Sequence, residues 1–133
     1  MALLDAWLVG RLTGFAGISA LVAARVYPSV LPQSPTLPAI TYEQSGGERL
    51  SGLTADTGLA IGEYTITSWG ATHASARALA EQVRLALQRY QDDAAEPPVL
   101  DGILQEEQSG LERDTRNWRT QQWWDIWYRE APA

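Results

Sequence analysis

Few residues of this chain could do acid–base or nucleophilic chemistry, and their spacing brings none of them together. His73 is the only histidine, and it stands beside Thr72 at the start of a predicted helix. A histidine in the first turn of a helix is typically exposed, and a catalytic base needs an orienting partner, which the neighbouring sequence does not supply. We therefore expect His73 to be a solvent-exposed residue rather than a catalytic base or a metal ligand.

Two adjacent acidic pairs are the other candidates for acid–base work. Glu106 and Glu107 fall in a predicted strand, where neighbouring side chains point to opposite faces, so they cannot act on one substrate. Asp92 and Asp93 fall in a predicted loop, where carboxylates are usually solvated. The sequence therefore shows no paired acid–base site.

Phosphate-binding and nucleophile motifs are also missing. Ser45-Gly46-Gly47 lacks the lysine and the helix that complete a phosphate-binding loop. Ser68, Ser75 and Ser109 have no nucleophile-elbow context. We predict that the protein is not an enzyme and that it uses no cofactor and no metal.

Composition narrows the protein class further. The chain has 133 residues, which suits a single domain over residues 1–133, and it has no cysteine for a disulfide or a thiolate site. A net charge of −6 argues against tight binding of nucleic acid through its phosphates. No apolar run approaches the ~20 residues of a membrane span, and the N-terminal residues resemble a first helical turn rather than a signal peptide. We expect no membrane partner.

Apolar periodicity predicts three helical segments. Apolar residues at helical spacing run from Leu4 to Phe15, and a shorter apolar segment follows at 18–22. Prolines at 28, 32, 35 and 38 then favour an extended crossing with little sheet pairing. A third, strongly amphipathic helix begins after Thr72 and carries its apolar stripe from Ala76 to Tyr90.

Four strands are predicted from alternation and β-branched content. They cover 39–44, 59–69, 99–108 and 118–128. Consecutive strands without a crossover helix pair antiparallel most readily, so we expect two hairpins merged into one sheet. The predicted fold class is α+β, with a four-stranded antiparallel sheet and helices packed on one face.

The last strand carries bulky aromatic residues on both faces. Alternation places Trp124, Ile126 and Tyr128 on one face and Trp123 and Trp127 on the other. A sheet in so small a domain buries one face against its own helices, so the other face is a candidate surface for a partner or a second copy. The alternative, that both faces are covered within the monomer, stays open at this point.

A polar, glycine-bearing stretch from Ser45 to Gly58 separates the first two predicted strands. It is too long for a tight hairpin turn, and loops of this length are usually functional or disordered. Arg49, Leu50 and Leu53 are its candidate contact residues for a partner, and a mobile surface loop is the alternative.

Several segments together resemble the tail-completion, or tail-terminator, family of long-tailed bacteriophages and phage-like gene transfer agents. The resemblance covers nearly the whole chain, and it rests on the order and spacing of its pieces. These are the N-terminal helix, Arg25-Val26-Tyr27-Pro28, Leu37-Pro38-Ala39-Ile40-Thr41-Tyr42, Gly58-Leu59-Ala60 with the strand ending at Trp69, Ala74 to Ala80 with Val83-Arg84, and Trp124-Asp125-Ile126-Trp127-Tyr128-Arg129.

The resemblance implies a structural protein of the virion tail. Family members form a hexameric ring that caps the head-proximal end of the tail tube, ends its polymerisation and offers the surface on which the head docks. The implied partners are further copies of the chain, the tail tube protein and the head–tail connector, with DNA passing through the lumen and assembly taking place in the host cytoplasm. Trp69, Trp123 and Trp127 join Arg49, Leu50 and Leu53 as candidate interface residues.

Two other functions remain as alternatives at this stage. A head-completion or connector protein at the head–tail joint fits a similar description. A small-ligand binding module would need a concave apolar pocket, which the tryptophans could line.

Overall fold

The computed structural model describes residues 3–51 and 56–130, without the side chains of residues 3, 49–51 and 56–57. Along the described chain, two helices are followed by three strands, a third helix and two further strands. They are α1 (Leu3–Gly14), α2 (Ala16–Val22), β1 (Val26–Pro28), β2 (Ala39–Ser51), β3 (Asp56–Gly70), α3 (His73–Leu87), β4 (Val99–Leu111) and β5 (Trp118–Arg129). No helix within this part of the chain is long and apolar enough to cross a membrane.

The strands form one sheet in the order β1-β2-β3-β5-β4. The hairpins β2–β3 and β4–β5 are joined by antiparallel pairing of β3 with β5, which confirms the predicted merger of two hairpins. The α+β class is confirmed, but the sheet has five strands rather than four. The additional strand, β1, pairs in parallel with Ile40–Tyr42 at the sheet edge and ends at Pro28, a residue that is tolerated at edges.

The prediction of a loop from Ser45 to Gly58 was wrong, because β2 extends to Ser51 and β3 begins at Asp56. β2 and β3 stay paired well beyond the predicted strand ends, with Gly46 opposite Glu63 and Gly47 opposite Gly62. A register shift between Gln44 and Gly46 absorbs Ser45 as a bulge. The long neighbouring strand therefore overrides the weak strand preference of the two glycines.

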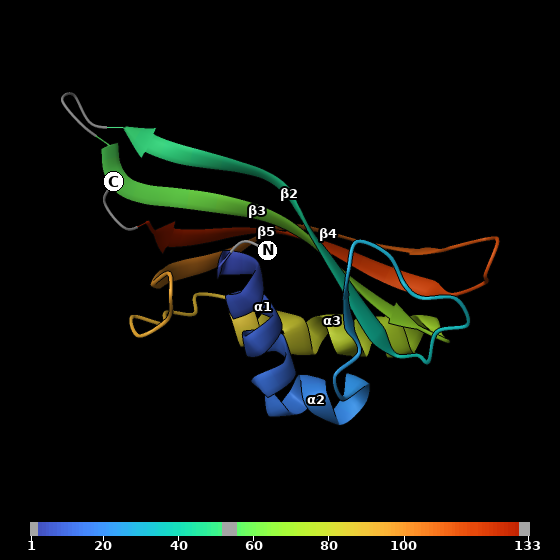
Figure 1. Ribbon diagram of the computed structural model, residues 1–133. Coiled ribbons are helices and arrows are strands. Elements are labelled where there is room, and N and C mark those ends of the chain that lie inside the picture. The colour runs from blue at the N-terminus through green and yellow to red at the C-terminus, as the bar shows by residue number, and fades with distance from the viewer. Residues whose placement is uncertain (1–2, 52–55, 131–133) are drawn as a thin grey trace.

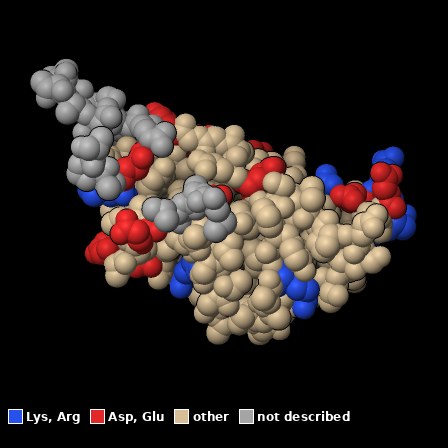
Figure 2. Space-filling view, viewed as in Figure 1, with Lys and Arg blue, Asp and Glu red and all other residues tan. Residues whose placement is uncertain are grey.

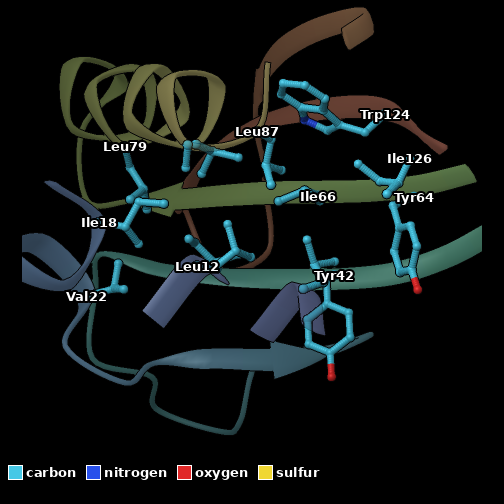
Figure 3. Close-up of a cluster of buried hydrophobic side chains, with 14 of the residues drawn as sticks. Leu12, Ile18, Val22, Tyr42, Tyr64, Ile66, Leu79, Leu87, Trp124 and Ile126 are labelled. Atoms are coloured by element: carbon cyan, nitrogen blue, oxygen red, sulfur yellow. The ribbon is translucent and has the colours of Figure 1, made fainter. Parts of the chain in front are cut away.

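All three helices lie on one face of the sheet (Figure 1). The side chain of Thr72 accepts a hydrogen bond from the backbone N–H of Ser75 and caps α3, as predicted. The buried stripe of α3 packs on β3, β4 and β5, while α1 and α2 pack beside it on the β1 and β2 side. The core between the layers includes Leu12, Ile18, Ile66, Leu79, Leu87, Trp124 and Ile126 (Figure 3).

Candidate assembly surface

The sheet face opposite the helices, called the open face here, carries no helix (Figure 1). Residues directly opposite each other in antiparallel strands share a face, so the pairing defines which side chains lie there. Trp123 of β5 stands between Thr65 of β3 and Glu106 of β4, and Trp127 stands between Ile61 and Asp101. The alternation predicted for β5 is confirmed, because Trp124 and Ile126 are buried under the helices while Trp123 and Trp127 are half-buried on the open face.

Threonines and tryptophans give the open face a mixed polar and aromatic character. Thr41, Thr65 and Thr67 are buried among larger neighbours although no helix covers them. Trp69 belongs to the same face, and its indole Nε1 donates to Thr41 Oγ1 at 3.0 Å. The three predicted interface tryptophans therefore all lie on one surface, with Trp69 near one end of it.

Carboxylates are concentrated on this face. Three successive rows across the sheet carry six of them, and no arginine stands in these rows, although Asp101 pairs with Arg89, which follows α3, at 2.8 Å. The six residues are Glu43 and Glu48 of β2, Glu63 of β3, Asp101 and Glu106 of β4, and Asp125 of β5. Glu63 and Asp125 stand directly opposite each other, an arrangement of like charges that costs stability in an isolated sheet. The open face is therefore strongly acidic around its two central tryptophans.

The candidates Arg49 and Leu50 lie in β2 near the end of the β2–β3 hairpin rather than in a loop. The backbone of Arg49 stands opposite Ala60. Leu53 lies outside the described residues. This hairpin end lies at one end of the sheet, and the turn between β4 and β5 lies at the opposite end (Figure 1).

The residues considered for catalysis do not form a site. His73 is exposed and makes an edge contact with Trp118, with ring centroids 5.2 Å apart. Glu106 is on the open face, while Glu107 is on the helix side, where its Oε1 accepts from Gln122 Nε2 at 2.8 Å. Within residues 3–51 and 56–130, no cluster of three or more acidic or histidine side chains is arranged to hold a metal ion.

Asp92, Ser109 and Ser68 lie among groups of the fold rather than in a catalytic site. Asp92 Oδ2 accepts a hydrogen bond from Trp7 Nε1 at 3.3 Å. The hydroxyls of Ser109 and Thr120 are 2.9 Å apart. The hydroxyl of Ser68 is buried and has no hydrogen-bond partner among the residues that the structure describes. None of these groups has the neighbouring base that nucleophilic catalysis requires.

One buried polar pair fastens α1 to the sheet. The hydroxyl of Tyr64 donates a hydrogen bond to a carboxylate oxygen of Asp5. Burial, and then this bond to a negatively charged acceptor, raise the pKa of Tyr64 above its ordinary value. The pKa of Tyr42 is also raised, first by burial and second by the nearby charge of Asp5.

Two hollows formed by the described residues differ in which tryptophan they contain. A groove of about 450 Å³ runs between the 29–35 crossing, Trp69 and the β4–β5 turn. A second hollow of about 340 Å³ is lined by Trp7, Arg11 and Tyr90. Trp123 and Trp127 line neither of these two hollows.

The sequence patterns did not identify two exposed leucines. Leu21 of α2 is 38% exposed and Leu85 of α3 is 52% exposed, both on the outside of the helices. Leu85 could have been noticed, because it stands off the apolar stripe of an otherwise amphipathic helix.

The fold has a similar counterpart among solved structures. It is similar to a chain of a solved structure described as the virion of a native gene transfer agent (GTA) particle, with a TM-score of 0.74 and 18% sequence identity over 92% of this chain and 91% of that chain. No curated protein matches the sequence. The family model described as "Tail completion protein gp17" matches residues 6–129. Tail completion is a structural, non-enzymatic role, and by this match over nearly its whole length the chain belongs to the tail completion protein gp17 family.

Proposed function

We propose that this protein forms a hexameric ring that caps the head-proximal end of a phage or gene-transfer-agent tail tube. Membership of the tail completion family supports the role in the tail, and the fold similarity to a chain of a gene transfer agent virion supports assembly into a particle. The main observation in support of the ring proposal is the open face, where Trp123 and Trp127 have no helix over them. Partly buried tryptophans at the centre of a flat surface are typical of contact hot spots.

The ring ends polymerisation by geometry. A tube grows while each added ring presents the same surface again, and it stops when the last ring presents a different one. The two hairpin ends at opposite ends of the sheet supply two different surfaces (Figure 1). In this proposal, one side of the ring matches the tail tube and the other side receives the head–tail connector.

The β2–β3 hairpin end contributes the remaining candidate contacts. Arg49, Leu50 and Leu53 are proposed to touch either the neighbouring protomer or the tube. The long pairing of β2 with β3 supports this role, because it forms an arm that carries Arg49 and Leu50 to one end of the sheet.

DNA passes through the proposed ring without being held. The net charge of −6 supports this part of the proposal, because phosphate binding requires clustered cations. The protein needs no nucleotide, metal or other cofactor to assemble, and the ring joins the tail in the host cytoplasm.

Deletion of the gene tests this function. Particles lacking the protein should have tails of irregular, often excessive length that fail to join heads, while the heads still fill with DNA. Purified protein added back without nucleotide or metal should restore joining. Empty heads beside tails of normal length would instead assign the protein to packaging or to the head-side connector.

A further inference from the structure

The two sides of the molecule carry opposite charge. The outer surface of α1, α2 and α3, called the helix layer here, belongs to segments 3–25 and 73–89, which contain five arginines and two carboxylates. Asp5 accepts from Tyr64, and two of the arginines are paired, Arg84 with Glu81 at 2.5 Å and Arg89 with Asp101 of β4 at 2.8 Å, which leaves more arginines than carboxylates in these segments. Arg77 is exposed and makes no ion pair within the described residues. The helix layer is therefore cationic, whereas the open face is acidic.

The helix layer is also smooth and partly apolar. The exposed apolar residues in and after α2 and in α3 are small apart from two leucines, and these two helices contact each other. These residues are Ala16, Ala20, Leu21 and Ala24 in and after α2, and Ala74, Ala78 and Leu85 in α3. Figure 2 shows the lower side of the molecule, where the helices lie, as largely uncharged with patches of basic residues. Such a surface suits close approach of a flat partner.

A second copy of this chain supplies the matching partner. Packing one open face on another would bring two sets of six carboxylates together, which opposes association. Packing the open face on the helix layer instead sets carboxylates against arginines, and Trp123 and Trp127 against Leu21, Leu85 and the alanines. This contact is heterologous, the type of contact that repeats around a ring when the rotation between protomers closes.

We infer that the open face of one protomer docks on the helix layer of the next protomer, which makes Leu21, Arg77 and Leu85 interface residues. This inference rests on the proposed ring and specifies how its protomers meet. It predicts a head-to-tail order in which each protomer uses both surfaces at once.

The absence of cysteine makes this order directly measurable. Glu63→Cys places one thiol on the open face, and Ala78→Cys places one on the helix layer, both at exposed positions. With a short bismaleimide, an equimolar mixture of the two variants should give linked dimers, whereas each variant alone should give few. Stronger self-linking of Glu63→Cys than linking in the mixture would overturn the inference in favour of face-to-face packing.

A charge substitution gives a second test that does not depend on cross-linker reach. Leu85→Glu places a carboxylate against the acidic open face, and we expect at least ~30-fold weaker association by native mass spectrometry, the size of a lost hot spot. Ala94→Glu is the matched control, because Ala94 is exposed between α3 and β4 and lies outside both surfaces, and it should assemble like wild type.

The outcomes separate the inference from the proposed function. Hexamers of normal stability from Leu85→Glu would overturn face-to-helix docking while leaving the ring intact. A wild-type protein that yields neither hexamers nor cross-links, alone or on purified tail tubes, would remove the ring itself and the inference with it.

Discussion

Trp123 and Trp124 are consecutive residues of β5 whose side chains lie on opposite faces of the sheet. Trp124 is 1% exposed beneath the helices, and its Nε1 donates to Gln122 Oε1 at 3.3 Å. Trp123 is half-buried on the open face between Thr65 and Glu106. One of the two residues therefore holds the fold together, and the other is available to a partner.

Alanine at these two positions should separate stability from assembly. Trp124→Ala should lower the free energy of unfolding by about 3–5 kcal/mol, as is usual for a buried aromatic residue. Trp123→Ala should lower it by only about 1 kcal/mol but should abolish ring formation. Urea unfolding followed by far-UV circular dichroism measures the first quantity, and native mass spectrometry measures the second. Equal losses of stability in the two variants would contradict the assignment of faces.

The hydrogen bond between Tyr64 and Asp5 predicts a loss of stability in alkali. Because the pKa of Tyr64 is raised in the folded state, the stability that it contributes is fully present below its ordinary pKa of 10.0 and declines as pH rises above that value. The decline should reach up to about 1.4 kcal/mol per pH unit. Tyr64→Phe should reduce this slope in urea unfolding measured between pH 8 and pH 11. An unchanged slope in that variant would show that Tyr64 is not the group responsible.

Glycine at position 102 is required by the close approach of α3 to β4. A Cβ at this position would lie 2.2 Å from the carbonyl oxygen of Leu87, a backbone atom that cannot turn away. Gly102→Ala should therefore destabilise the protein by about 1–3 kcal/mol. Gly10→Ala is the matched control, because its Cβ would meet nothing within 4 Å and alanine favours a helix by about 1 kcal/mol. Thermal unfolding should shift downward for the first variant and not for the second.

Arg49 should matter to assembly and not to the fold. Its backbone is paired in β2 opposite Ala60, near the end of the hairpin. Arg49→Ala should change the free energy of unfolding by less than about 0.5 kcal/mol, and weaken binding to a neighbour or to purified tail tubes by about 1 kcal/mol, the upper range for an exposed ion pair. Cosedimentation with tubes measures the binding. Full tail completion by a variant with a shortened hairpin would rule out an essential role for this end.

Local patterns predicted the parts of the fold in which sequence periodicity and tertiary structure agree. The alternation around Trp123 and Trp124 assigned both faces of β5, and the apolar stripe with its Thr72 cap located α3. The prediction failed at Gly46 and Gly47, where pairing with β3 outweighs local preference. β1 was missed because a strand of three residues that ends in a proline carries no detectable period. The acidic character of the open face also depends on strand register, because its carboxylates come from four different strands.

The most direct test of the account measures tail length in particles whose only tail completion protein is the Trp123→Ala/Trp127→Ala variant. This variant keeps the core intact, so it should fold as a monomer with nearly normal stability. By electron microscopy, the account predicts tails of irregular length that carry no heads beside filled heads, as in the deletion. Tails of normal length joined to heads, produced by the folded double variant, would contradict the claim that a ring assembled through the open face completes the tail.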